Sequence, residues 1–568
     1  MNLRWNVLNE KNELVKPLRF EGKNQMDVVK EIIEAFNSYD FVFFVSPTGS
    51  GKSIIALQVL YNAFPSGIIV VPTKHLQKQY YTDYNPATGR FRIPNLRIKF
   101  ILGRSNFVCP LTGKRCDDPN LPCTRRLNEN ECRFDVAKEC PMWIPRYPKR
   151  LANKVRYVIE KDYSSYETAS GEWVIFHSED EEADCPYLRQ YYEAYLNSEV
   201  VVMNDKLWLI ETLAKRKPIW FRAIEVLDEV DSLLDSLVRG FSIKYQNIEK
   251  YLNEATKSKW DYIIRKKYVE REDVFDVIFE ILKCLENNKA NAESVYYKVN
   301  RIVDDFDKLT YKRDAENNKI YFFYKSPSNF VKEIFRNSNQ KILGMSATLH
   351  DESVLQEYFG FEPDSYCIIR GKTRFPGTVY ILKNRRWWVS HRNWYEIKSD
   401  FMNEVKRIVN DAVKKNYRVL IQAHAFKYVN DLGIPIDDAK HDMFELWKQG
   451  KIRALVSTRL KRGVDIGKKY APKLLVIPKF PLPDKESMQI KCLFETLPED
   501  VAGRVYRDIA KRDLIQQVGR VLRSDDDWAV VAVMDNLALN ILKESNCWEL
   551  REVDNLEAGK TIQLRREG

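Results

Sequence analysis

Short runs of consecutive apolar residues recur along the first part of the chain, and each ends at a polar or glycine-containing loop. The runs cover residues 41–45, 67–71, 199–203, 223–227 and 341–345. They do not alternate apolar with polar residues, which is typical of strands buried on both faces of a parallel sheet. Helical apolar spacing over residues 26–36 and 54–64 predicts helices that cover such a sheet. We therefore expect an α/β domain.

A second series of the same kind begins at about residue 366. Its expected strands are residues 418–422, 454–456, 474–477 and 529–534. Two such series in one chain predict two doubly wound domains with a cleft between them. The chain length of 568 residues agrees with more than one domain, because hydrophobic cores stop growing at about 250–300 residues.

Two segments interrupt the first series, and we interpret both as insertions. Residues 105–190 are rich in Cys, Pro and charged residues, whereas residues 235–335 are charged and helix-like. The expected boundaries are residues 1–104, 191–234 and 339–365 for the first domain, 105–190 and 235–338 for the two insertions, and 366–568 for the second domain.

Composition and charge narrow the class of protein. Hydrophobic residues make up 44% and charged residues 30%, which is typical of a soluble globular protein. The apolar runs are far shorter than the ~18 residues that a membrane span needs, and the N-terminus has no apolar signal-peptide core. We expect a cytoplasmic protein with no membrane partner. The net charge of +11 favours a polyanion such as nucleic acid as partner, although a basic soluble protein without that partner has the same balance.

A glycine-containing loop follows the first apolar run and precedes a helical segment. Such a loop presents backbone N–H groups to phosphate at a helix N-terminus, where Lys52 can reach the β- and γ-phosphates and Ser53 can bind Mg²⁺. Pro47 stands where the strict Walker A spacing has a glycine, and an ordinary glycine-rich turn is the alternative. The residues expected to hold ATP are Gly49, Ser50, Gly51, Lys52 and Ser53.

Two further groups of charged residues suit the chemistry of ATP hydrolysis. Asp228 and Glu229 follow another apolar run, where Asp228 can ligand Mg²⁺ and Glu229 can orient the attacking water. Arg520 and Arg523 are three residues apart and therefore share one helix face, from which they can stabilise charge on the γ-phosphate. Taken alone, the first pair can be a solvated loop and the second a basic surface helix.

In this order along the chain, these segments resemble the motifs of helicase superfamily two, and within it the XPD/DinG group of iron–sulfur DNA helicases. The matching segments are residues 49–53 for motif I, 228–231 for motif II, 346–349 for motif III, 463–465 for motif V and 516–523 for motif VI. The resemblance implies two RecA-like motor domains, with a cysteine-rich metal-cluster insertion and a mostly helical arch insertion in the first. It also implies ATP-driven movement along single-stranded DNA in the 5′-to-3′ direction.

The resemblance adds binding residues and shows two departures. It implies that Gln25 reads adenine and that Gln516 and Asp465 contribute to nucleotide binding. The group usually has a histidine where this chain has Asp231, and a glutamate where it has Arg462. In the group, both positions lie near the path that couples ATP hydrolysis to movement on DNA. We therefore expect this chain to differ from the group in the efficiency of that coupling.

Six of the ten cysteines lie between residues 109 and 185. A local cluster in a chain expected to be cytosolic favours a metal site over a disulfide framework, and four thiolates suit zinc or a [4Fe–4S] cluster equally. Cysteines packed as small hydrophobes are the alternative. The resemblance of residues 103–109 and 185–187 to the group's cluster segments implies iron–sulfur. The expected ligands are Cys109, Cys132, Cys140 and Cys185, with Cys116 and Cys123 competing for the two middle places.

The chain is therefore expected to be a monomeric DNA helicase of repair or recombination that acts on single-stranded and forked DNA. An accessory motor of a mobile element or defence system, acting on R-loops or RNA–DNA hybrids, is one alternative. A redox-sensing nucleic-acid-binding protein, whose affinity ATP merely switches, is another.

Overall fold

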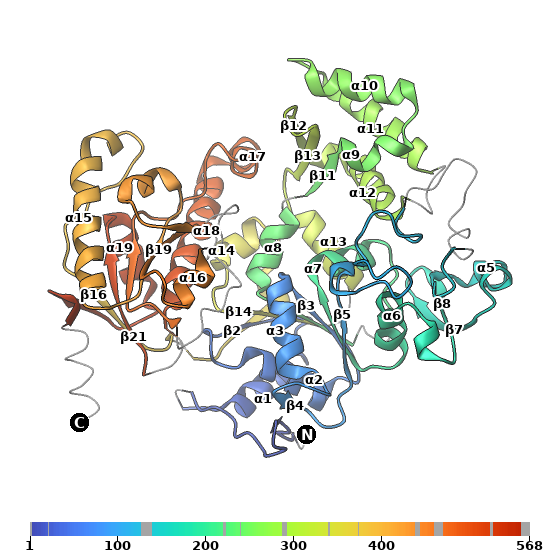
Figure 1. Ribbon diagram of the computed structural model, residues 1–568, viewed down its shortest axis with the longest axis horizontal. Coiled ribbons are helices and arrows are strands. Elements are labelled where there is room, and N and C mark those ends of the chain that lie inside the picture. The colour runs from blue at the N-terminus through green and yellow to red at the C-terminus, as the bar shows by residue number, and fades with distance from the viewer. Residues whose placement is uncertain are drawn as a thin grey trace.

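Two seven-stranded parallel sheets, each covered by helices, dominate the computed structural model (Figure 1). The expected α/β class with two parallel-sheet domains is confirmed. The structure describes residues 3–20, 22–125, 139–219, 223–238, 240–286, 292–338, 341–372, 374–437, 443–458, 470–522 and 526–557.

The sheet of the first domain has the strand order β15-β2-β14-β10-β3-β9-β5. The strands are β2 (Phe41–Val45), β3 (Gly67–Val71), β5 (Ile98–Ile101), β9 (Val200–Asn204), β10 (Ile224–Asp228), β14 (Ile342–Ser346) and β15 (Tyr366–Arg370). One face packs on α1 (Gln25–Ala35), α2 (Lys52–Ala63) and α3 (Lys74–Tyr84). The other face packs on α7 (Asp205–Leu213), α8 (Val230–Val238) and α13 (Ser328–Ser338).

Burial on both faces explains why these strands read as continuous apolar runs. Phe41 and Phe43 enter the core on one side of the sheet, whereas Val42 and Phe44 enter the core on the other. Strand β15 pairs with β2 through the register Tyr366↔Phe41, so the first sheet extends to Arg370, beyond the expected domain boundary at residue 366.

The second domain has a sheet of strand order β18-β19-β17-β20-β21-β16-β22. The strands are β16 (Thr378–Leu382), β17 (Val419–Gln422), β18 (Ile436–Asp437), β19 (Ala454–Ser457), β20 (Leu474–Ile477), β21 (Trp528–Val533) and β22 (Leu550–Val553). Helix α15 (Trp394–Lys414) covers one face, and α16 (Phe444–Lys448), α18 (Glu499–Gly519) and α19 (Asn536–Ser545) cover the other. In Figure 1, α18 lies on the side of this domain that faces α14 (Glu352–Glu357) and α8 of the first domain.

Both insertions leave the first sheet and return to it. The cysteine-rich segment runs between β5 and β9 and contains β6 (Arg146–Pro148), α5 (Ala152–Ile159), β7 (Asp162–Thr168), β8 (Gly171–His177) and α6 (Pro186–Leu196). Its three strands form an antiparallel sheet, and β8 supplies Val174 and Phe176 to a small core that the sequence pattern did not predict.

The second insertion stands above the first domain in Figure 1 and includes an antiparallel sheet as well as helices. Its elements are β11 (Phe241–Lys244), α9 (Tyr245–Ile248), α10 (Glu254–Arg265), α11 (Arg271–Glu286), α12 (Glu293–Asp304), β12 (Leu309–Asp314) and β13 (Lys319–Tyr324). Its core is continuous with that of the first domain. Among the described residues, no helix combines the length and the apolar character that a membrane crossing requires.

Candidate functional site

The loop between β2 and α2 has the backbone shape of a phosphate-binding loop. Gly49 and Gly51 have φ values of 82° and 73°, in the left-handed region that favours glycine. Gly51 is the N-cap of α2 and has no side chain to cap the first N–H groups, which leaves them oriented toward an anion. The ammonium of Lys52 folds back over the loop and donates to the carbonyl oxygens of Ser46 at 3.0 Å and Pro47 at 3.3 Å. In this position, Lys52 is available to a phosphate.

Gln25 is packed against the same loop and is only 1% exposed. Its Nε2 donates to the carbonyl oxygen of Ser50 at 3.0 Å, and its Oε1 accepts from the N–H of Leu18 at 2.9 Å. A Cβ atom on Gly51 would lie 2.2 Å from Nε2 of Gln25, so a side chain here would displace the amide of Gln25 as well as meet an unfavourable φ. The side chain keeps one N–H and one lone pair for a further partner, and adenine recognition stays a prediction.

The acidic pair lies at the carboxyl end of β10, two strands from β2 in the sheet. Asp228 is 4% exposed and accepts from the hydroxyl of Tyr80 at 2.8 Å. Burial raises the pKa of Asp228, and the nearby positive charge of Lys52 opposes that rise. Glu229 has a φ of 51°, an uncommon conformation for a residue other than glycine. A buried carboxylate beside a phosphate-loop lysine suits a Mg²⁺–phosphate complex.

Helix α18 of the second domain reaches across to the first domain. Nε2 of Gln516 donates to Oγ1 of Thr348 at 2.8 Å and to Oδ2 of Asp231 at 3.4 Å. The structure thus brings together the segments that resemble motifs II, III and VI, although they are far apart in the sequence. Arg520 follows at the C-cap of α18 and is 9% exposed. Arg523 and Asp465 lie outside the described residues.

Five of the six clustered cysteines are described, and their thiols interact. Burial, together with the neighbouring thiols of Cys185, Cys109 and Cys123, raises the pKa of Cys116 to about 11. The pKa of Cys140 also rises to about 11, first through burial and then through the thiols of Cys123, Cys185 and Cys109. Burial raises the pKa of Cys185, while the N–H groups of the turn after it favour its thiolate. Cys132 lies outside the described residues.

These cysteines are close enough to influence one another, and thiolates are the donors that zinc and iron–sulfur clusters take. Cys109 and Cys116 lie on one tight turn, in which the N–H of Cys109 donates to Lys114 and that of Cys116 to Phe107. Arg104 donates to Sγ of Cys123 at 3.4 Å. Within the part of the chain that the structure describes, no three His, Cys, Asp or Glu side chains are already arranged as metal ligands.

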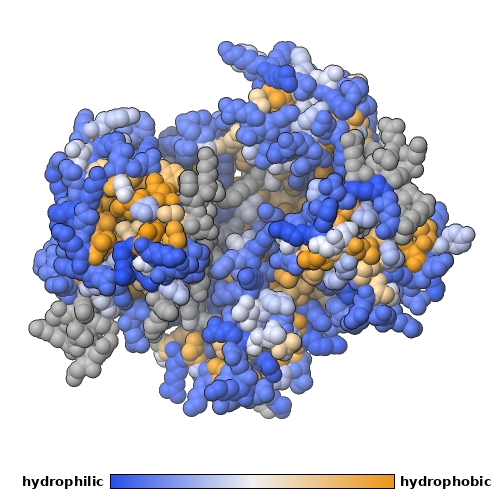
Figure 2. All heavy atoms as spheres, in the orientation of Figure 1, coloured by the Kyte–Doolittle hydropathy of each residue, from blue (hydrophilic) through white to orange (hydrophobic). Residues whose placement is uncertain are grey.

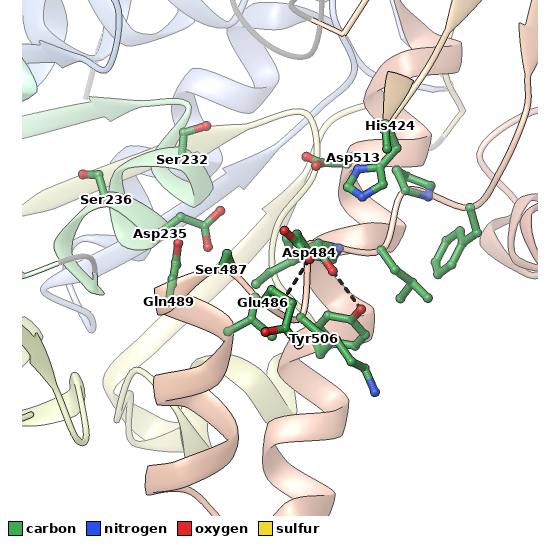
Figure 3. Close-up of a pocket in the computed structure, with 18 of the residues that line it drawn as sticks. Ser232, Asp235, Ser236, His424, Asp484, Glu486, Ser487, Gln489, Tyr506 and Asp513 are labelled. Atoms are coloured by element: carbon green, nitrogen blue, oxygen red, sulfur yellow. Dashed lines mark hydrogen bonds between the residues drawn. The ribbon is translucent and has the colours of Figure 1, made fainter. Parts of the chain in front are cut away.

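A cavity of about 2140 Å³ opens between the second domain, the first domain and the second insertion. Figure 2 shows a mostly hydrophilic face that is hollowed in this region. Figure 3 shows Ser232, Asp235 and Ser236 of α8 on one wall, with His424 and Asp513 of the second domain across from them. The same cavity is lined by one exposed aromatic residue and several cations, namely Trp388, Lys206, Lys298, Arg392, Lys427 and Lys479.

Sequence reasoning missed two parts of this site. The segment that includes Trp388 was not singled out, although tryptophan beside Arg and His in a loop is a signal for nucleic-acid contact. It also missed Asp508 and Arg512, which share one face of α18 with Gln516 because the three residues recur every four positions; of the three, the sequence singled out only Gln516.

Comparisons with known proteins agree with these motifs. A family model described as the helicase C-terminal domain matches residues 398–545, and one described as the res subunit of type III restriction enzyme matches residues 22–107. A protein of Methanocaldococcus jannaschii named as a probable ATP-dependent helicase is 20% identical over 90% of this chain and 91% of its own length.

Solved structures share the fold over nearly the whole chain. A structure titled XPD helicase is 14% identical, covers 93% of this chain and 99% of its own, and has a TM-score of 0.59. Xpd4 of S. tokodaii is 12% identical, covers 93% and 99%, and has a TM-score of 0.51. Together, the two family models and the relative support an ATP-dependent helicase, and the solved structures show that the chain shares the fold of the XPD helicase structures.

Proposed function

We propose that this ATP-dependent helicase moves along single-stranded DNA, in the 5′-to-3′ direction that the resemblance implies, and separates forked DNA ahead of it. The observation that carries the proposal is the bond of Gln516 to Thr348 and Asp231. It joins the second domain to the segments beside the phosphate loop, so a nucleotide held by Lys52 would lie at the domain interface. Binding and release of ATP would then move one domain relative to the other.

We assign the following roles to the site residues. Lys52 and the N–H groups of residues 49–51 would hold the phosphates, Asp228 would hold Mg²⁺, and Glu229 would orient the attacking water. Arg520, together with Arg523, would stabilise the charge that develops on the γ-phosphate. Hydrolysis would remove that charge and loosen the contact between the two domains.

The interdomain cavity is the proposed path of the DNA strand. Trp388 is 61% exposed and lines this cavity, so a base can stack on its indole ring. Across the cavity, burial lowers the pKa of Lys298, and the positive charges of Lys319 and Lys206 lower it further. Phosphate groups placed beside these lysines would relieve their mutual repulsion.

The proposed strand-separation element is the cysteine-rich insertion, held by a [4Fe–4S] cluster. The proposed ligands remain Cys109, Cys132, Cys140 and Cys185, with Cys116 and Cys123 competing for the two middle places. The thiols of Cys109, Cys123 and Cys185 each raise the pKa of both Cys116 and Cys140, which supports a shared site for the described cysteines. Bound there, the cluster would cross-link segments that otherwise share only a few apolar contacts.

Strand displacement tests the proposal. With ATP, the protein should separate a DNA fork that carries a 5′ single-stranded tail and should leave a fork with only a 3′ tail intact. Separation of RNA–DNA hybrids but not of DNA forks would favour an accessory motor that acts on hybrids. ATP hydrolysis without strand separation on either substrate would contradict the proposal.

Replacing Trp388 with Ala should weaken binding of single-stranded oligothymidylate about 5- to 150-fold, because stacking of one base contributes ~1–3 kcal/mol. Fluorescence anisotropy of a labelled strand measures the affinity. Tyr395→Ala is the matched control, since Tyr395 is 82% exposed but does not line the cavity. Equal affinity of the two variants would remove Trp388 from the DNA path.

A further inference from the structure

Two helices from different domains present facing rows of charged side chains. On α8 of the first domain, Asp231 and Asp235 are four residues apart. On α18 of the second domain, Asp508, Arg512 and Gln516 are spaced in the same way. Residues four apart share a helix face, so each helix carries its polar row on the side turned toward the other domain.

Arg512 joins the two rows. Its Nη1 donates to Oδ2 of Asp231 at 2.9 Å, its Nη2 donates to Oδ2 of Asp235 at 3.1 Å, and its Nε donates to Oδ2 of Asp508 at 3.0 Å. The side chain of Arg512 is 2% exposed and that of Asp231 is fully buried. Every edge of the guanidinium therefore faces a carboxylate. Such a buried ion pair is costly to break because it leaves an uncompensated charge away from water.

His350, just after the segment that resembles motif III, completes the group. Its Nδ1 lies 2.7 Å from Oδ2 of Asp508, and its Nε2 lies 3.4 Å from the carbonyl oxygen of Asp231 and 3.5 Å from Oδ1 of Asp235. The other oxygen of Asp508 accepts from the N–H of Asp351 at 3.0 Å. Burial opposes ionisation of Asp508, but Arg512 and His350 outweigh it, so the pKa of Asp508 lies well below its usual range.

The same group reaches the proposed ATP site through Asp231. Its carboxylate accepts from Oγ of Ser346 at 2.7 Å and from Oγ1 of Thr348 at 3.3 Å. Asp231 also lies two residues after Glu229 on the chain. A displacement of α18 would pull directly on the helix that begins immediately after the acidic pair.

We propose that Arg512 is a positioning residue, and that the Asp231–Arg512 pair, supported by His350, takes the place of the histidine that the XPD/DinG group usually has at position 231. The pair links the position of the second domain to the orientation of Glu229. This inference rests on the proposed function, because it concerns how DNA binding stimulates ATP hydrolysis.

Steady-state ATP hydrolysis by the full-length protein, with and without saturating oligothymidylate, tests the inference. Arg512→Gln should lower the DNA-stimulated kcat about ten-fold or more, within the range typical of coupling between sites, while the KM for ATP changes less than about three-fold. Arg512→Lys keeps the positive charge but loses the planar guanidinium that bonds three carboxylates at once. This variant should therefore retain part of the stimulation that Arg512→Gln loses. Asp231→His should also lose stimulation, since a neutral histidine accepts a single hydrogen bond and carries no negative charge, whereas the carboxylate of Asp231 accepts from several donors, Arg512 among them.

Arg507→Gln is the matched control, because Arg507 is exposed on the same helix, and it should behave like the wild type. The double variant Asp231→Asn/Arg512→Gln should lose no more stimulation than Arg512→Gln alone. If Arg512→Gln does not fold, the DNA-stimulated kcat of Arg512→Lys and of Asp231→His tests the inference instead. Stimulation at the wild-type level in these variants would overturn the inference but not the proposed function. A double variant that loses clearly more stimulation than Arg512→Gln alone would do the same. A wild-type protein that DNA does not stimulate would overturn the proposed function and this inference with it.

Discussion

Replacing Lys52 with Ala should lower ATP hydrolysis about 10²- to 10³-fold or more, the loss typical when one charge-stabilising donor is removed from an active site. Lys52 now bonds the carbonyl oxygens of its own loop, contacts that a bound phosphate would replace. Without the ammonium, the N–H groups of the loop would still face the phosphates but could not balance their charge. A phosphate-release assay at saturating ATP and single-stranded DNA measures the loss.

Two measurements make this result specific. The affinity of Lys52→Ala for single-stranded oligothymidylate should stay near that of the wild type, because Lys52 does not line the interdomain cavity. Lys30→Ala is the control for the loss of a lysine, since Lys30 lies on α1 in an exposed pair with Glu34, and it should hydrolyse ATP normally. Normal turnover by Lys52→Ala would show that the loop after β2 is not the ATP site.

Replacing Cys185 with Ser should remove most of the iron from the protein and with it the ability to separate strands. Cys185 occupies the N-cap position of α6, where the N–H groups of Tyr187 and Leu188 favour the thiolate that a metal needs. Serine cannot supply that thiolate. Since the small core of the insertion uses few apolar side chains, loss of the cross-link should also lower the thermal stability of this segment.

Iron and acid-labile sulfide per chain, together with the absorption spectrum of anaerobically purified protein, measure the effect. The wild type should show broad absorption near ~400 nm, which thiolate–iron bonds produce. Cys367→Ser, which changes a cysteine of β15 outside the insertion, should keep it. A colourless wild type with stoichiometric zinc would rule out the iron–sulfur assignment, and equal iron in both variants would remove Cys185 from the site.

The sequence predicted the central strands better than the edges of the sheets. Strands β2, β3, β9, β10 and β14 are buried on both faces, so each reads as an unbroken apolar run. Strand β5, with the sequence IKFI, and strand β15, with YCIIR, lie at the two edges of the first sheet, and neither was assigned as a strand. Edge strands need less apolar surface, which is why their pattern is weaker.

For the site, local motifs were readable and long-range partners were not. The loop ending at Lys52 and the acidic pair at Asp228 follow from the residues next to them in the sequence. The departure at Asp231 was visible too, but its partner Arg512 is 281 positions away, and nothing local indicates that the two meet. The sequence could not select among the cysteines for the same reason, because their grouping depends on how distant turns pack. The roles of the motif residues remain predictions that the variants above test.

The central claim is that both domains close on one nucleotide, and the hydrolysis rate of Arg520→Gln tests it most directly. Arg520 belongs to the second domain, whereas Lys52 and Glu229 belong to the first. If the nucleotide lies between them, ATP hydrolysis should fall about 10³-fold, as expected when an arginine that stabilises γ-phosphate charge is removed, while fluorescent ATP binds nearly as tightly as to the wild type. Hydrolysis at the wild-type rate would contradict the claim, because the second domain would then take no part in the reaction.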